Sequence, residues 1–145
     1  MNTTTNTIFD KRKAEIQKEF QQLIAKKNEP QSSVGNGIFD RYKNPVVTRN
    51  HAPIEWRYDL NEATNPFLME RISINATFNA GAMKWNNKYI LVVRVEGVDR
   101  KSFFAIAESP NGVDNFQFWD KPCVIPQTEE PDTNVYDMRL VHHED

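Results

Sequence analysis

Asp137 is the residue of this sequence best placed for acid–base chemistry. It lies in a strand-like segment, residues 134–141, and Arg139 follows it two positions later. Acidic residues are depleted in strands, so a carboxylate at this position needs a reason. It could be a functional carboxyl group that a new strand presents at an opening, or it could be an edge charge or the partner of Arg139 in a structural ion pair. The local pattern leaves these alternatives open.

Other polar residues interrupt apolar strand patterns at points where a strand could meet a cavity. Arg94 and Glu96 share one face of a strand with apolar residues, and they mark either a cavity edge or an exposed ion pair. Asn79 precedes Ala80-Gly81-Ala82, where small side chains let a backbone or a ligand come close. Packing is the simpler explanation for that run.

Several other kinds of chemistry find no support in the sequence. Cys123 is the only cysteine, which excludes an internal disulfide and a cysteine-based zinc site. His142 and His143 lie near the end of the chain without the spacing of helical metal ligands. The sequence has no glycine-rich phosphate loop and no Gly-x-Ser-x-Gly motif. We therefore expect neither a metal nor a cofactor.

Alternating apolar residues and turn signals predict a sheet in the second half of the chain. Asn86-Asn87 and Pro110-Asn111-Gly112 are turn sequences between strand-like runs. They predict a four-stranded antiparallel meander, the size of one β-propeller blade, followed by the start of another unit at 134–141. The expected strands are 78–85, 88–96, 102–108 and 116–119.

The first half of the chain predicts a helix and an irregular segment. Residues 8–27 have apolar residues at helical spacing, and Thr7 and Asp10 have the spacing of a capping box. The apolar side of this helix needs a partner, and a polar linker at 31–37 favours a neighbouring subunit, hence a homo-oligomer. Residues 38–70 contain several prolines and recurrent apolar residues, which predict an ordered wrapping segment with short strands. We place the domain boundary between 1–37 and 38–145.

Composition limits the class of protein. With 145 residues, 11% aromatic content and a net charge of −2, the chain is long enough for one domain with a core and has no basic field for nucleic acid. Its polar N-terminus lacks the apolar region of a secretion signal, and no stretch reaches transmembrane length. We expect a cytoplasmic protein that does not act on nucleic acid or at a membrane.

From about residue 28 to its end, the sequence resembles glycoside hydrolase family 130, the β-mannoside phosphorylases and related β-mannosidases. Trp56-Arg57-Tyr58-Asp59-Leu60-Asn61, the stretches 65–71 and 93–103, the Asn79 segment and Tyr136-Asp137-Met138-Arg139 carry the resemblance together. Many relatives have Glu-Asp-Pro-Arg where this chain has Tyr-Asp-Met-Arg. The latter form is that of the branch acting on mannosyl-glucose.

The resemblance implies an all-β fold, with the first blade and the start of the second blade of a five-bladed β-propeller. It implies inverting phosphorolysis of β-1,4-mannosyl-glucose to mannose 1-phosphate and glucose, with inorganic phosphate as co-substrate. Asp137 would be the general acid, while the phosphate-holding residues of the family would lie beyond residue 145. We therefore expect the 145 residues alone to be inactive. The residues implied to line the sugar site are Arg71, Asn79, Arg94, Arg100 and Arg139.

Two other functions stay open at this point. The same fold could hydrolyse β-mannosides, which would require a base to activate water. A non-catalytic β-domain that binds carbohydrate is the alternative from a different class. Consumption of phosphate separates the first two functions, and binding of sugar without turnover would indicate the third.

Overall fold

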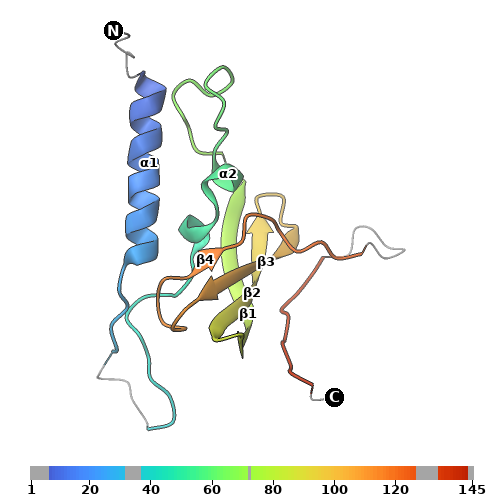
Figure 1. The fold of residues 1–145 in the computed structure, drawn as a ribbon. Coiled ribbons are helices and arrows are strands. Elements are labelled where there is room, and N and C mark those ends of the chain that lie inside the picture. The colour runs from blue at the N-terminus through green and yellow to red at the C-terminus, as the bar shows by residue number, and fades with distance from the viewer. Residues whose placement is uncertain (1–6, 32–36, 72, 127–133, 144–145) are drawn as a thin grey trace.

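A computed structural model describes residues 7–31, 37–71, 73–126 and 134–143. One long helix, a short 3-10 helix, a second short helix and four strands follow one another along the chain (Figure 1). None of the helices in these ranges is both long enough and apolar enough to cross a membrane. The elements are α1 (Ile8–Ala25), η1 (Arg49–His51), α2 (Ile54–Arg57), β1 (Ile74–Trp85), β2 (Lys88–Gly97), β3 (Ser102–Ser109) and β4 (Gln117–Phe118).

The four strands form one antiparallel sheet in the order β1-β2-β3-β4, which confirms the predicted meander. Asn86 and Asn87 form the β1–β2 turn at φ 46° and 60°, a region that Asn tolerates better than most residues. Gly112 adopts φ 74° between β3 and β4. The first strand begins at Ile74, four residues before the predicted start at Phe78. The sheet could therefore be predicted from alternation and turn residues.

The irregular segment before the sheet covers one of its faces. Residues of η1 and its surroundings, including the fully buried Ala52, join the core formed by β2 and β3. Trp56 of α2 packs edge-on against Phe103, with ring centroids 5.7 Å apart. Wrapping is confirmed, but the predicted short strands within 38–70 are wrong. This segment has η1, α2 and two isolated bridges instead, because its prolines lack the N–H groups that a ladder requires.

Helix α1 packs against the same chain. Its capping box is present, with Thr7 Oγ1 accepting from Asp10 N at 3.1 Å. Phe9 and Ile16 are buried in a second apolar cluster with Tyr58 and Leu68. The preference for a neighbouring subunit as the partner of this apolar side is therefore wrong, because residues 54–68 already cover it. The homo-oligomer itself stays a prediction, as does the boundary at residue 37, and linker residues 32–36 lie outside the described residues.

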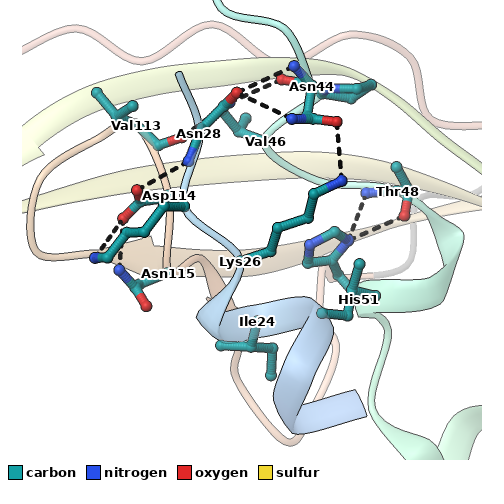
Figure 2. Close-up of a pocket in the computed structure, with 13 residues that line it drawn as sticks. Ile24, Lys26, Asn28, Asn44, Val46, Thr48, His51, Val113, Asp114 and Asn115 are labelled. Atoms are coloured by element: carbon teal, nitrogen blue, oxygen red, sulfur yellow. Dashed lines mark hydrogen bonds and ion pairs between the residues drawn. The ribbon is translucent and has the colours of Figure 1, made fainter. Parts of the chain in front are cut away.

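A polar network fastens the end of α1 to the sheet, and we call Asn28, Asn44 and Asp114 the helix latch (Figure 2). Asp114, in the β3–β4 connection, is buried and accepts from Asn28 N at 3.2 Å and Asn111 Nδ2 at 2.8 Å. Asn28 Nδ2 donates to Asn44 O at 2.8 Å, and Asn44 N donates back to Asn28 Oδ1 at 3.0 Å. The latch therefore joins three segments that lie far apart in the sequence.

The predicted strand at 134–141 is wrong. Residues 134–143 are irregular, and none of them is assigned to a strand. The segment instead packs on the face of the sheet at Gly81, where an ideal Cβ would lie 2.7 Å from Met138 O and 3.3 Å from Leu140 Cγ. A strand requires a hydrogen-bonded neighbour, and alternation in the sequence alone does not supply one. The small-residue run 80–82 thus admits a backbone of this chain.

Candidate functional site

Three segments bring their polar side chains together at Asp137. Asn79 Nδ2, from β1, donates to Asp137 Oδ2 at 3.0 Å. Arg94 Nη1, from β2, lies 3.5 Å from Asp137 Oδ1. Arg139 turns elsewhere, and its Nη1 donates to Met138 O at 3.1 Å. The ion pair of Asp137 is therefore with a residue of the sheet and not with its neighbour in sequence.

A β-bulge directs Asn79 at the carboxylate. Phe78 pairs with Arg94 and Gly81 pairs with Val92, so two residues of β1 lie opposite one residue of β2. Asn79 occupies the bulge at φ 47°, in the left-handed region where Asn is among the favoured residues. Bulges often re-aim a side chain beside a functional site. Here the bulge turns the amide of Asn79 toward the segment that carries Asp137.

Arg94 is held in a partly apolar environment. Its side chain is 12% exposed, and its Nε donates to Ser102 Oγ of β3 at 3.0 Å. Its guanidinium carbon lies 4.6 Å from the ring centroid of Phe78 and 4.5 Å from that of Tyr136. Both distances are within the range of cation–π contacts. The predicted alternative of an exposed ion pair with Glu96 is wrong, because the charged group of Arg94 is buried against other partners.

The environment of Asp137 favours its ionised form. The hydrogen bond from Asn79 is the largest cause that lowers the pKa of Asp137 below 3.8, and Arg94 also lowers this pKa. Desolvation raises the pKa but is outweighed. The side chain is 35% exposed, so the carboxylate remains accessible to a ligand. It can accept hydrogen bonds from sugar hydroxyl groups, and it can release or take up a proton.

The remaining predicted site residues have other partners. Arg71 Nη2 lies 3.4 Å from Asp59 Oδ1. Arg100 adopts φ 65° in the β2–β3 connection, where its 79% exposed side chain approaches Glu96 Oε1 at 3.4 Å. The structure thus brings Asn79, Arg94 and Asp137 together. It places Arg71, Arg100 and Arg139 in contacts that do not include Asp137.

Sequence reasoning missed the residues that hold this site in place. Tyr136 and Phe78 contact Arg94, and Asn134 accepts from Ser102 N at 2.7 Å and donates to Arg100 O at 3.1 Å. The strand register places Phe78 opposite Arg94, so that contact had a signal in the predicted hairpin. Tyr136 and Asn134 contact residues more than thirty positions away in the sequence. Alternation and turn signals carry no information about contacts at that separation.

The described side chains form no cluster with the ligands of a metal site. Within 7–31, 37–71, 73–126 and 134–143, no group of three or more His, Cys, Asp or Glu residues could hold a metal ion. The arrangement at Asp137 offers a carboxyl group, an amide and a guanidinium. Such groups recognise hydroxyl-rich or anionic ligands and can transfer a proton.

The chain is similar in sequence to a curated bacterial protein. It is 58% identical over 139 residues, 96% of this chain, to a protein of Bacteroides fragilis named 4-O-beta-D-mannosyl-D-glucose phosphorylase. This similarity confirms the resemblance to mannosyl-glucose phosphorylases that the sequence predicted. The chain spans about a third (35%) of the length of that relative. No protein-family model matches the chain.

Proposed function

We propose that the full-length protein carrying this chain catalyses phosphorolysis of 4-O-β-D-mannosyl-D-glucose to mannose 1-phosphate and glucose. The observation that carries the proposal is the convergence of Asn79, Arg94 and Asp137 in a chain 58% identical to a phosphorylase of that name. Since the chain spans 35% of the relative, the activity is assigned to the full-length protein. Asp137 is the general acid of this proposal.

The reaction requires one proton donor and one nucleophile. An oxygen of inorganic phosphate forms a bond to the anomeric carbon of the mannosyl unit while the bond to the glucose oxygen breaks. The glucose oxygen takes up a proton, which Asp137 supplies directly or through a sugar hydroxyl. Phosphate is already anionic, so no base is needed to activate it, in contrast to the water of an inverting hydrolase. One carboxyl group therefore suffices.

Because the pKa of Asp137 is lowered, binding of the substrates must raise it before Asp137 can act as a general acid. Asn79 and Arg94 lower the pKa of this carboxyl group, which is ionised at neutral pH, whereas a general acid must be protonated. A phosphate anion that enters the site disfavours a second negative charge nearby, so its binding raises the pKa of Asp137. We infer that phosphate binding favours protonation of Asp137.

The proposal extends to the residues that bind the sugars and to the architecture of the sheet. Arg71, Arg100 and Arg139 are proposed to contact the sugars, and their exposed positions support this role. The antiparallel sheet β1-β2-β3-β4 is proposed to be one blade of a β-propeller, which its order and its connections support. In such a blade the first strand lines the central opening, and Asn79 lies in β1.

The test is an assay of the full-length protein with 4-O-β-D-mannosyl-D-glucose, with and without inorganic phosphate. Formation of mannose 1-phosphate and glucose that requires phosphate supports the proposal. Release of free mannose in the absence of phosphate would indicate a β-mannoside hydrolase. Binding of the disaccharide without either product would indicate a non-catalytic carbohydrate-binding protein.

Asp137→Asn tests the role of the carboxyl group. The amide keeps the shape of the side chain but cannot deliver a proton, and general acid catalysis typically contributes about 10²–10⁴-fold. We expect turnover to fall by about this factor, while calorimetry shows disaccharide binding close to wild type. Phosphorolysis at the wild-type rate would remove Asp137 from the role.

A further inference from the structure

Tyr136 is adjacent to Asp137 in sequence and contacts the same cation. Its ring centroid lies 4.5 Å from the guanidinium carbon of Arg94, whose Nη1 lies 3.5 Å from Asp137 Oδ1. The two neighbouring residues therefore hold one guanidinium group, Tyr136 through its ring and Asp137 through its carboxylate. Phe78 contributes a second ring at 4.6 Å.

The backbone around Asp137 depends on side-chain contacts for its position. Residues 134–143 are not assigned to a strand, so no ladder of backbone hydrogen bonds fixes them. Asn134 fastens one side of the segment to Ser102 and Arg100, and Met138 rests at Gly81 on the other side. Between these points, within the described residues, the hydrogen bonds, the ion pair and the ring contact of the segment are with Asn79 and Arg94.

We propose that Tyr136 is a positioning residue for Asp137. Its ring lies against the guanidinium of Arg94 and so holds Nη1 toward Asp137. The inference rests on the proposed function, because it assigns Tyr136 a part in placing the general acid. It goes beyond that function in assigning a role to the tyrosine that precedes the acid, whose ring contacts the cation.

The ring, not the hydroxyl group, performs this role. The contact is between the centroid and the guanidinium carbon, and the described structure shows no hydrogen bond from the Tyr136 hydroxyl. Tyr136 is 66% exposed, so the contact belongs to the weaker, solvated class of cation–π interactions. Such contacts correspond to about a two- to five-fold change in rate when lost.

The experiment compares Tyr136→Leu with Tyr136→Phe in the full-length protein, using the disaccharide and inorganic phosphate. The Phe variant keeps the ring, and we expect its kcat to stay within about twofold of wild type. The Leu variant loses the ring, and we expect kcat to fall about two- to five-fold with KM little changed. The alkaline limb of its kcat profile should also move to higher pH, since a loosened Arg94 lowers the pKa of Asp137 less.

A double-mutant cycle separates this role from direct contact with the sugar. Arg94→Gln removes the cation, so Tyr136→Leu should have no further effect on residual kcat in that background. If Tyr136→Leu still lowers kcat in the Arg94→Gln background, or changes KM alone, the proposal is overturned in favour of a substrate contact. Wild-type kcat in the Leu variant would overturn it while leaving the proposed function intact. Absence of mannose 1-phosphate from the wild-type protein would overturn both.

Discussion

The helix latch and the Asp137 site use similar groups for different ends. In each, a carboxylate with a lowered pKa binds an Asn side chain and a basic side chain. Asp114 is 8% exposed, and its oxygens accept from Asn28, Asn111, Asn115 and Lys27. Asp137 is 35% exposed and accepts from Asn79 and Arg94 alone, within the described part of the chain.

The two carboxylates differ in how many hydrogen-bond acceptor positions they leave free. A carboxylate has about four acceptor positions, and Asp114 accepts from four donors, three at Oδ1 and one at Oδ2. At Asp137 the solvent-facing positions stay available for a ligand. A buried and fully bonded carboxylate stabilises a fold, whereas a partly exposed one with spare acceptor capacity can do chemistry. Residue type does not distinguish the two, but geometry does.

Replacement of Asp114 is expected to have the largest effect on stability. Asp114→Ala leaves Asn28 N and two side-chain amides without their acceptor, and hydrogen bonds to charged groups contribute about 1.5–3 kcal/mol. We expect the free energy of unfolding of the full-length protein to fall by about 2–3 kcal/mol, with faster hydrogen exchange in α1. The kcat of the folded protein should stay at the wild-type value. A reduced kcat would break the separation between the two regions.

The contribution of Asp114 to the free energy of unfolding should depend on pH. Hydrogen bonding, first from Asn111, lowers the pKa of Asp114 below 3.8, despite an opposing effect of burial. A lowered folded-state pKa contributes stability that is present above the unfolded value and is lost as pH falls through the folded value. The stability difference between wild type and Asp114→Ala should therefore be constant near neutral pH and shrink below about 3.8. A difference that grows on acidification would contradict this assignment.

Gly81→Ala should have the next largest effect, and it should fall mainly on activity. A Cβ here would lie 2.7 Å from Met138 O, a backbone atom next to Asp137, so the segment must shift. Overpacking of this kind costs about 1–3 kcal/mol, and a displaced general acid lowers kcat. Kinetics of the full-length variant test this. Ala82→Ser is the matched control, because Ala82 is exposed and the added atom should leave kcat unchanged.

The comparison also shows what could be predicted from sequence. The sheet was predictable because Asn86-Asn87 and the apolar run 90–93 of β2 are local signals. The apolar side of α1 was predictable for the same reason, but its partner was not, since a pattern does not specify which surface covers it. The strand at 134–141 was predicted wrongly because alternation was present without a pairing neighbour.

For the site, too, the local features could be predicted from sequence and the long-range contacts could not. Asp137, Asn79 and Arg94 were chosen from sequence, and the family resemblance supplied the roles. Their mutual contact depends on a bulge in β1 and on a segment that arrives from 43 residues beyond Arg94. Such long-range placement results from tertiary packing, which local sequence does not encode. The contacts of Tyr136 and Asn134 were missed for this reason.

The smallest predicted effect is the most informative about the chemistry of Asp137. Asn79→Gly removes the amide that most lowers the pKa of Asp137, while glycine keeps the positive φ of the bulge. The pKa of Asp137 should rise toward its ordinary value. If Asp137 works as the protonated acid, activity falls as pH rises through its pKa, so the alkaline limb of the kcat profile moves to higher pH.

The direction of that shift decides between two roles. If Asp137 instead worked as an ionised group, activity would fall as pH drops through its pKa, and the acid limb would move to higher pH. Asn86→Gly is the matched control, because it removes an Asn at a nearly equal φ of 46° in the β1–β2 turn, with no contact to Asp137. Its profile should coincide with wild type. An unchanged profile in Asn79→Gly would mean that the hydrogen bond to Asp137 does not persist during turnover, and the contrast with the fixed network at Asp114 would then be greater still.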